Sequence, residues 1–121
     1  MHRGLFTCAS DTTLMEVART MARRAIHCVV VAGSGGAPWG VISDLDLVAA
    51  ATVRDLDDQT AGGSASTPLI TVAPNETLER AAQLMIEHAT SHLIVIGPDG
   101  LPIGVISTLD VAATLATEAP S

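Results

Sequence analysis

The sequence predicts an α/β (α+β) fold built from two tandem copies of a β-α-β-β-α unit. The first observation is an internal repeat: residues 7–50 return at 71–114 with a constant offset of 64 and no gap, and 18 of the 44 aligned positions are identical. The second is that each copy alternates helical and strand-like hydrophobic patterns in the same order. A duplication this short usually represents one structural unit packed against its copy. We therefore expect any site in one half to have a pseudo-symmetric counterpart in the other.

The first helix of each copy is predicted from its start signal and its apolar spacing. Thr13 precedes Glu16 by three residues, the pattern of a capping box, in which both side chains accept hydrogen bonds from backbone N–H groups. Thr77 occupies the corresponding position in the second copy, where Arg80 replaces the glutamate. The apolar residues that follow recur at helical spacing and define one face: Leu14, Val17, Ala18 and Met21, and again Leu78, Ala81, Ala82 and Met85.

Two strands and a second helix complete each copy. A short β-branched run is followed by a glycine-containing turn and a returning strand, which is the pattern of a hairpin. The second helix is predicted to begin at Ser43 and at Ser107. In the first copy the strand, the turn and the returning strand are predicted at 28–31, 33–36 and 39–42. In the second copy they are predicted at 93–96, 97–100 and 103–106.

The repeats divide the chain into three parts. We expect residues 1–53 to form the first repeat, 54–68 a linker and 69–117 the second repeat, and the two repeats to make one module. The linker is rich in Asp, Gly, Ser and Thr, a composition that favours turns and leaves room for only a short helical turn.

Composition excludes several classes of function. The chain has 121 residues, a net charge of −7 with thirteen acidic residues and six arginines, and one Phe, one Trp and no Tyr. A nucleic-acid-binding protein needs cations for the phosphates and aromatic rings for stacking, so nucleic-acid binding is disfavoured. No apolar run approaches the roughly 20 residues of a membrane span, and no secretory signal is visible, so we expect a cytoplasmic protein without a membrane contact.

The hydrophobic content is nevertheless high, and it indicates an interface with another chain. Hydrophobic residues make up 48% of the sequence, and the mean hydropathy is +0.43. The surplus apolar surface favours burial against a partner. The two cysteines, Cys8 and Cys28, lie in apolar runs and are expected to be reduced, buried thiols.

The motif Gly-Val-Ile-Ser-x-Leu-Asp occurs twice, ending at Asp46 and at Asp110, where a strand is predicted to become a helix. The N–H groups at a helix start attract anions such as phosphate. A serine there can donate its hydroxyl to a phosphate oxygen, and an aspartate three residues later can accept both hydroxyls of a ribose. Ser43 with Asp46, and Ser107 with Asp110, are therefore candidates for holding the sugar-phosphate of a nucleotide. The same spacing is that of a structural helix cap, so both interpretations stay open.

The repeat as a whole resembles the CBS domain family, which is named after cystathionine β-synthase. The resemblance lies in the order Thr-x-x-Pro-x-x-Thr-Leu, an apolar helix with methionine, a β-branched strand, a glycine turn and Gly-Val-Ile-Ser-x-x-Asp. The second copy follows this order closely from Thr71 through Pro74 to Asp110, whereas the first has Ser10 where the second has Pro74. The two copies cover nearly the whole chain.

The resemblance implies a pair of CBS repeats, also called a Bateman module, packed with pseudo-two-fold symmetry and with two clefts between the repeats. It implies a regulatory, energy-sensing protein whose ligand is AMP, ADP, ATP or S-adenosylmethionine and which requires no cofactor. Such modules commonly pair with a second module, so we expect a homodimer formed through the helix faces. Small residues on these faces allow close approach: Ala18, Ala22, Ala49, Ala82 and Ala112.

The resemblance also assigns ligand-binding residues. The aspartate of the final motif would hold ribose and the serine would meet phosphate. The strand before the first helix would line the base. A basic residue often faces the phosphate just before the second strand, and two histidines fall close to that place, although at different aligned positions. The candidates are Ser43, Asp46, Ser107, Asp110, Thr7, Cys8, Thr71, Val72, His27 and His92.

The sequence departs from the family at the phosphate. No Lys or Arg lies beside either expected phosphate position, which argues against polyphosphate binding at neutral pH. His27 and His92 compensate only when protonated, so our hypothesis is weak binding that strengthens as the pH falls. Equal affinity at pH 6 and pH 8 would contradict it.

Three functions compete at this point. The first is a nucleotide sensor that acts on an effector protein. The second is a ligand-free dimerisation or protein-interaction module, which the apolar excess and the shortage of cations favour. The third is an enzyme, and the sequence shows no nucleophile and base at a suitable spacing and no metal motif. His88 and His92 are four residues apart, but they lie where a helix runs into a strand, so we expect no metal there.

Overall fold

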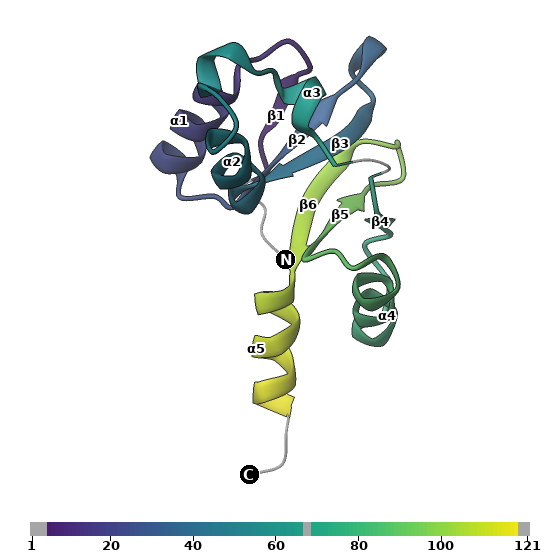
Figure 1. The fold of residues 1–121 in the computed structure, drawn as a ribbon. Helices are drawn as coiled ribbons and strands as arrows, with labels where there is room; N and C mark the ends of the chain where they lie inside the picture. The colour runs from purple at the N-terminus through teal and green to yellow at the C-terminus, as the bar shows by residue number, and fades with distance from the viewer. Residues whose placement is uncertain (1–4, 67–68, 119–121) are drawn as a thin grey trace. The chain divides into compact units, whose positions relative to one another are not determined.

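The computed structural model describes residues 5–66 and 69–118, which fall into two compact units, one ending at Leu69 and the other beginning at Ile70 (Figure 1). Each unit repeats the order strand, helix, strand, strand, helix. The predicted α/β (α+β) class and the repeated β-α-β-β-α order are therefore confirmed. The predicted boundaries at residues 53 and 69 stay predictions.

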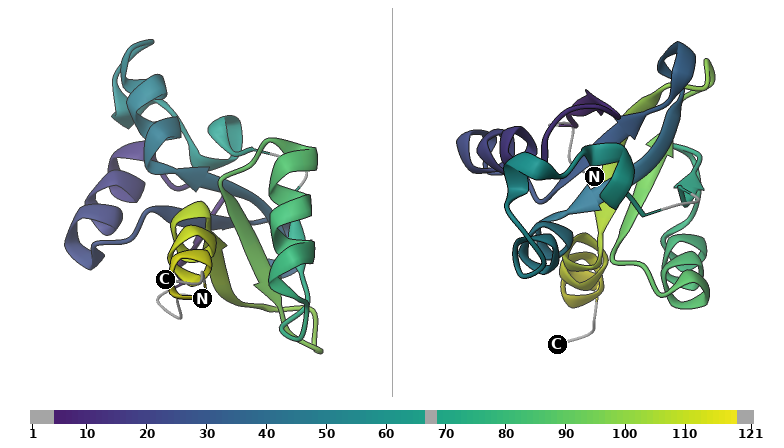
Figure 2. Two further views of the ribbon diagram at one scale, coloured as in Figure 1. Left: turned by 90° about the horizontal axis from the view of Figure 1, so that it is seen from below. Right: turned by 45° about the horizontal axis from the view of Figure 1, so that its top comes forward.

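The first unit is a three-stranded sheet with two main helices and an extra segment. The strand order is β1-β2-β3, with β1 parallel and β3 antiparallel to the central β2. Helices α1 and α2 pack against each other beside the sheet (Figures 1 and 2). The elements are β1 (Thr7–Ala9), α1 (Leu14–Arg24), β2 (Cys28–Ala32), η1 (Ser34–Gly36), β3 (Pro38–Ser43), α2 (Asp44–Ala51), η2 (Leu56–Asp58) and α3 (Ala61–Ser64).

The second unit repeats this arrangement. Its strand order is β4-β5-β6, again with one parallel and one antiparallel pair, and α4 packs against α5. The elements are β4 (Thr71–Val72), α4 (Leu78–His88), β5 (His92–Ile96), β6 (Pro102–Ser107) and α5 (Thr108–Glu118). The register is conserved between the units, because Cys28 faces Ser43 across the first hairpin and His92 faces Ser107 across the second.

The predicted helix starts are confirmed by their hydrogen bonds. The Thr13 hydroxyl accepts from the Glu16 N–H at 3.2 Å, and the Thr77 hydroxyl accepts from the Arg80 N–H at 3.1 Å. The threonine therefore caps both helices, whichever residue stands at the third helical position. The Glu16 carboxylate accepts no hydrogen bond from the Thr13 N–H, so the capping box predicted there is wrong in its glutamate half. Both helices end at an alanine in the left-handed region, with φ of 52° at Ala25 and 49° at Ala89.

The core of each unit lies between its helices and one face of its sheet. Alternate residues of the central strand contact the helices, as expected from the two-residue period of a strand. In β2 these are Val29 and Val31, and in β5 they are Leu93 and Val95. The buried clusters are Leu14, Val17, Met21, Val29, Val31, Ile42, Leu47, Ala50 and Ala61 in the first unit, and Val72, Ala81, Met85, Leu93, Val95 and Val111 in the second.

The segment predicted as a linker packs on the first unit. The Leu14 N–H donates to the Gln59 carbonyl at 2.9 Å, so the segment reaches the start of α1. Ser66 exchanges two backbone hydrogen bonds with Val41, of 2.9 and 3.2 Å, and thereby covers part of the outer edge of β3. A Cβ atom at Gly62 would come within 2.9 Å of the Ser10 Cβ, so this contact requires glycine. The segment thus completes the first unit.

Candidate functional site

The first candidate site is the junction of β3 and α2. Ser43 is the N-cap of α2, and its side-chain oxygen accepts a hydrogen bond from the Asp46 N–H at 3.2 Å. In return, Asp46 Oδ2 accepts from the Ser43 N–H at 2.8 Å, which completes a capping box. Both residues are half-buried. The sequence motif therefore places serine and aspartate in direct contact at a helix start.

The same arrangement recurs at the junction of β6 and α5. Asp110 Oδ2 accepts from the Ser107 N–H at 2.9 Å, and the Ser107 hydroxyl accepts from the Asp110 N–H at 3.2 Å. The Ser107 hydroxyl also lies 3.1 Å from Asp110 Oδ2 and donates to it. Because the helix start supplies partial positive charge, each junction combines a fixed carboxylate with oriented N–H donors. Such a pair can accept the hydroxyls of a sugar and attract an anion.

The helix cap already uses the aspartate carboxylate and the serine hydroxyl at each junction. In both junctions Oδ2 of the aspartate already holds a backbone N–H. A ligand hydroxyl has to share the carboxylate with that bond, and a phosphate has to share the serine hydroxyl. The structural interpretation of the motif is therefore correct in both repeats, and ligand binding is an additional role that the geometry permits.

His27 lies beside the first junction and is paired with an acid. Its Nδ1 is 3.0 Å from Asp44 Oδ2, and the Asp44 N–H donates to the His27 carbonyl at 3.0 Å. Both side chains are exposed, at 76% and 59%. In the second unit His92 lies opposite Ser107, and its Nδ1 is 3.1 Å from the Ser91 hydroxyl. The two histidines therefore flank the serines, in different settings.

Cys28 is a buried titratable group near the first junction. Burial, with a smaller effect from the nearby Asp44 carboxylate, raises the pKa of the Cys28 thiol to about 11. Burial also raises the pKa of Cys8, although a hydrogen bond with Thr12 partly opposes the shift. Both thiols are free, as predicted, but only Cys28 is buried; Cys8 is half-buried, contrary to the prediction. A protonated thiol at neutral pH is unreactive.

The raised pKa of Cys28 predicts that stability falls at alkaline pH. The unfolded thiol ionises near pH 9 and the folded one near 11, so only the unfolded state loses this proton in between. The free energy of unfolding should therefore drop by about 2 kcal/mol as the pH rises from 9 to 11. The chain contains no lysine and no tyrosine, so few other groups titrate in this window.

Urea unfolding followed by circular dichroism at pH 8, 9.5 and 11 measures this effect. In Cys28→Ala the decrease in the free energy of unfolding at alkaline pH should largely disappear. Cys8→Ala is the matched control and should keep most of it, because Cys8 is only half-buried. An unchanged pH dependence in Cys28→Ala would show that the loss has another origin.

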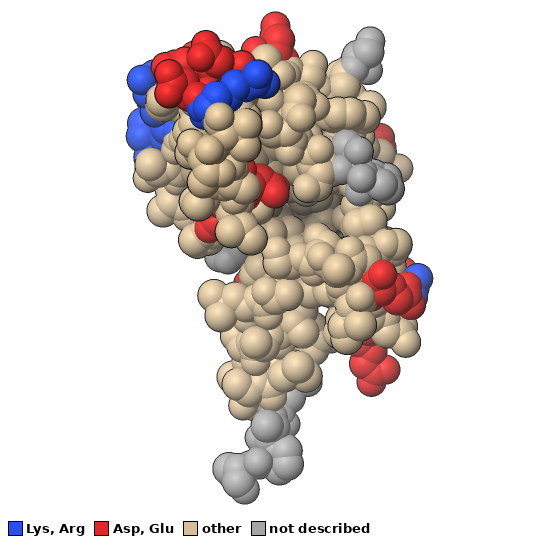
Figure 3. Space-filling view, in the orientation of Figure 1, with Lys and Arg blue, Asp and Glu red and all other residues tan. Residues whose placement is uncertain are grey.

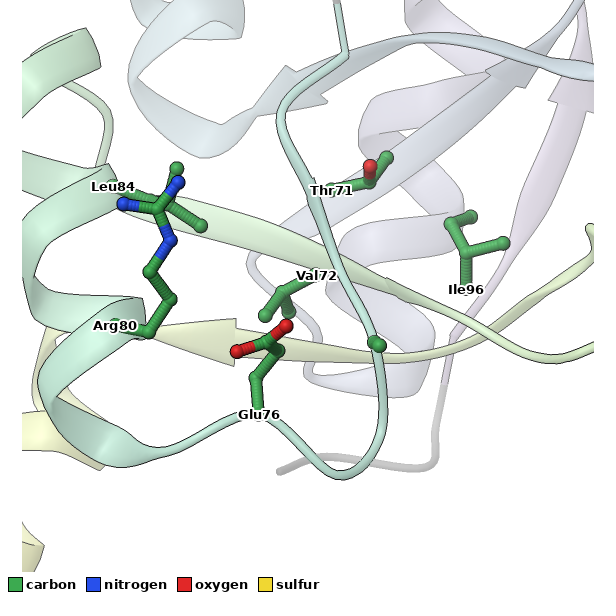
Figure 4. A pocket seen from close by; sticks show the side chains of 7 residues that line it. Thr71, Val72, Glu76, Arg80, Leu84 and Ile96 are labelled. Atoms are coloured by element: carbon green, nitrogen blue, oxygen red, sulfur yellow. The ribbon is translucent and has the colours of Figure 1, made fainter.

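The first strand of each repeat lines a pocket of its own. In the second unit a pocket of 380 Å³ lies between β4 and α4 (Figure 4), and Thr71 and Val72 both line it. In the first unit a pocket of 270 Å³ occupies the equivalent place, and Thr7 and Cys8 line it. Neither pocket is lined by the serine or aspartate of the same unit. Within one repeat, the structure therefore places the two groups of predicted residues at separate positions.

Two charged residues near these sites were missed by the sequence analysis. Asp44 pairs with His27, 17 residues away, and this contact depends on the register of the hairpin. Arg80 lines the pocket beside β4 (Figure 4), where the first repeat has Glu16. The alignment of the repeats showed that Arg80 replaces Glu16, but it indicated only a change in the helix cap and not a charged residue in a pocket.

The described residues contain neither a cluster of metal ligands nor a membrane-spanning helix. Across residues 5–66 and 69–118, no three His, Cys, Asp or Glu side chains lie close enough to hold a metal ion. None of the described helices has the length and apolar character needed to cross a membrane.

Comparison with known proteins decides the family. The family model for the CBS domain matches residues 1–52 and again 53–117. The chain belongs to the CBS domain family. Among curated CBS-type relatives, it is 29% identical over 113 residues to the CBS domain-containing protein YhcV of Bacillus subtilis, covering 93% of this chain and 79% of YhcV.

Other relatives are longer than this CBS chain. The uncharacterized protein MK0525 of Methanopyrus kandleri is 27% identical over 112 residues, which cover 91% of this chain and 57% of that protein. The chain thus spans little more than half the length of this relative, and the same holds for MJ0450 of Methanocaldococcus jannaschii, at 57%.

Solved CBS structures share the fold. The CBS domain pair of MJ0100 in complex with 5′-methylthioadenosine and S-adenosylmethionine has a TM-score of 0.82 at 18% identity, covering 94% of this chain and 93% of that one. CBSX2 in complex with AMP has a TM-score of 0.75 at 22% identity, covering 98% and 93%. The cytosolic domain of the Mg²⁺ channel MgtE in complex with ATP has a TM-score of 0.76 at 24% identity, covering 95% and 46%.

Proposed function

We propose that this CBS-domain chain is a non-catalytic regulatory module that binds an adenosine-containing nucleotide and acts on an effector protein. The ligand class is AMP, ADP, ATP or S-adenosylmethionine. The observation that carries the proposal is the pair of junctions in which Asp46 and Asp110 are held at helix starts in contact with Ser43 and Ser107. The nucleotides in the related structures of MJ0100, CBSX2 and MgtE support the same ligand class.

Each predicted residue has a role in this proposal. Asp46 and Asp110 hold the ribose hydroxyls, and Ser43 and Ser107 contact phosphate. The base lies against the first strand of a repeat, at Thr7 and Cys8 or at Thr71 and Val72. A location in the cytoplasm, where these nucleotides are abundant, is part of the proposal.

The two histidines give the proposal a pH dependence. His27 lies beside the first junction, with its Nδ1 3.0 Å from Asp44 Oδ2, and His92 lies opposite Ser107 in the second unit. Binding should be stronger at pH 6 than at pH 8, because a protonated histidine attracts the phosphate. Calorimetry at both pH values with His27→Gln and His92→Gln measures how much each histidine contributes.

Thermal unfolding and calorimetry with each nucleotide test the proposal. A ligand at about 100 times its dissociation constant adds about 2.7 kcal/mol to the free energy of unfolding and raises the melting temperature. Asp46→Asn and Asp110→Asn keep an oxygen acceptor for the helix cap while removing the charge that the ribose contacts. Each variant is compared with itself without ligand, so a change in its own stability cancels.

The outcomes separate the two candidate functions. A nucleotide-dependent shift that disappears with one of the variants supports the sensor and identifies the working repeat. Shifts that persist in both variants place the nucleotide elsewhere. No shift with any nucleotide favours the ligand-free interaction module and directs the search to the protein partner.

We further propose that the module forms a homodimer through its second helices. Leu45 at the start of α2 and Leu109 at the start of α5 are 73% and 74% exposed, at equivalent positions of the two repeats. Leu115 on α5 is 55% exposed, and Figure 3 shows no charged side chain over α5 on the face drawn. Because the same apolar residue recurs, a second copy of the chain offers a complementary surface.

Sedimentation equilibrium measures the oligomeric state directly. The wild-type chain should sediment as a dimer, and Leu45→Glu with Leu109→Glu should shift it to the monomer, because each charge would be buried in the interface. Val53→Glu is the control, since Val53 is equally exposed, at 76%, but lies outside the two helices. A monomeric wild type would contradict the proposal.

A further inference from the structure

The pocket between β4 and α4 has a polar lining that the nucleotide proposal does not use. Its volume is 380 Å³, within the range of small-molecule sites. Thr71 and Val72 enter from the strand, whereas the remaining residues come from the loop before α4, from α4 itself and from the end of β5 (Figure 4). The lining residues are Thr71, Val72, Ala73, Glu76, Arg80, Leu84 and Ile96.

One side of the pocket carries both signs of charge. Glu76 and Arg80 are four residues apart, and Figure 4 shows both side chains rising from the same edge, beside Val72. Among the described residues they form no ion pair with each other. The rest of the lining is largely apolar, with Val72, Leu84 and Ile96. The pocket therefore offers a cation, an anion and an apolar wall to one small molecule.

The first repeat provides an internal comparison. Its equivalent pocket of 270 Å³ has Glu16 at the position of Arg80 and Thr12 at the position of Glu76. Thr20 stands where the second repeat has Leu84. The fold thus forms a hollow with an apolar wall in both repeats, since Phe6, Val17 and Val29 line the first one. Only in the second repeat does the hollow carry a pair of opposite charges.

We propose that the pocket between β4 and α4 binds a free α-amino acid with an apolar side chain. The Arg80 guanidinium recognises the carboxylate, for which its planar fork of donors is suited. The Glu76 carboxylate accepts hydrogen bonds from the ammonium group, and the apolar side chain lies against Val72, Leu84 and Ile96. The pocket of the first repeat rejects the same ligand, because Glu16 repels the carboxylate.

This site is distinct from the proposed nucleotide contacts at Ser107 and Asp110, which do not line the pocket. It shares Thr71 and Val72 with the strand proposed to meet the base, so amino acid and nucleotide are tested separately. The amino acid should bind Asp110→Asn as well as the wild type. Failure of nucleotide binding therefore leaves the amino-acid proposal standing, and the reverse is also true.

Nuclear magnetic resonance of the ¹⁵N-labelled full chain, titrated with L-leucine, tests the proposal. The amide signals of Thr71, Val72 and Arg80 should shift, whereas those of Thr7 and Thr20 in the first repeat should not. Two analogues dissect recognition: 4-methylpentanoate lacks the ammonium group and 3-methylbutylamine lacks the carboxylate. Each should bind about tenfold more weakly than leucine or worse, because a charged group of the pocket is left unpaired.

Matched variants locate the effect. Arg80→Gln and Glu76→Gln should each weaken leucine binding by about tenfold or more. The cap of α4 uses the backbone N–H of Arg80, so it persists in the first variant. Glu79→Gln removes a charge from the same helix outside the pocket and should leave binding unchanged.

Three results would overturn the inference. One is the absence of localised shifts with leucine. Another is equal binding of 4-methylpentanoate and leucine, which would indicate a general carboxylate site. The last is equal loss of binding in Glu79→Gln and Arg80→Gln, which would indicate an effect of net charge.

Discussion

Replacing Leu14 by alanine should destabilise the protein far more than the same change at Leu78, although the two leucines are equivalent in the sequence repeat. Leu14 is fully buried, at 0% exposure, whereas Leu78 is only partly buried. The difference arises because Leu56 and Ala61 of the segment after α2 pack against the core that contains Leu14. Leu14→Ala leaves a closed cavity and should lower the free energy of unfolding by about 3–4 kcal/mol.

The change at Leu78 should cost about 1–2 kcal/mol, because water already reaches the site and less apolar surface is lost. Urea unfolding of both variants under identical conditions measures the difference. Both substitutions are at the first position of a helix that follows a threonine cap, so helix propensity and capping cancel in the comparison. Equal costs at the two positions would mean that the segment after α2 does not shield Leu14 in solution.

Replacing Gln59 by methionine should lower the free energy of unfolding by about 3 kcal/mol. Gln59 is the buried polar side chain of the first unit, and its Nε2 donates to the Ala50 carbonyl at 2.9 Å and to the Arg54 carbonyl at 3.0 Å. Both carbonyls lie at or just after the end of α2, so this amide closes the helix. Methionine has a similar length but no donor, so the Arg54 carbonyl loses this partner and the Ala50 carbonyl keeps only its backbone donors, among them the Val53 N–H at 3.1 Å.

Unfolding by urea, followed by circular dichroism, checks this value. Gln83→Met is the control, because Gln83 is exposed on α4 and its replacement should change stability by no more than about 0.5 kcal/mol. Gln59→Glu adds a sharper test, since a carboxylate facing two carbonyls should be more costly than methionine at pH 7. A methionine variant as stable as the wild type would show that water satisfies the carbonyls.

The parts of the fold that depend on neighbours in the sequence were predictable. The Thr13 and Thr77 caps, the hairpins and the Ser-x-x-Asp junctions follow from contacts over three to five residues, and each appears where the pattern placed it. The repeat made these predictions stronger, because a pattern seen twice at one offset is rarely accidental. The strand ends differ by a residue, since β3 begins at Pro38 rather than at the predicted residue 39.

The packing of residues 54–66 was not predictable in the same way. This packing depends on single contacts between residues far apart in the sequence, such as Gln59 with Leu14 and Ser66 with Val41. A composition of Asp, Gly and Ser predicts turns, and η2 and α3 are indeed short, but composition does not indicate which surface a turn covers. Gly62 shows the difficulty well, because its requirement for glycine comes from Ser10, far away in sequence.

The candidate site was predictable in its chemistry more than in its arrangement. The contact between Ser43 and Asp46 is local and follows from spacing. The pairing of His27 with Asp44 required the hairpin register, and the charge pattern around Arg80 required knowing which residues line the hollow beside β4. Side chains that meet only through the tertiary fold leave no regular spacing in the sequence.

The placement of residues 54–66 on the first unit has a consequence for synthesis of the chain. Ser66 and Gln59 leave the ribosome after α2, yet Leu14 and Val41 depend on them for backbone hydrogen bonds. At about 5–20 residues per second, the ribosome needs on the order of one second or more to pass from Ala51 to Ser66. During that interval the apolar start of α1 stays open to water, so the nascent first unit presents a binding surface to chaperones that the finished protein lacks.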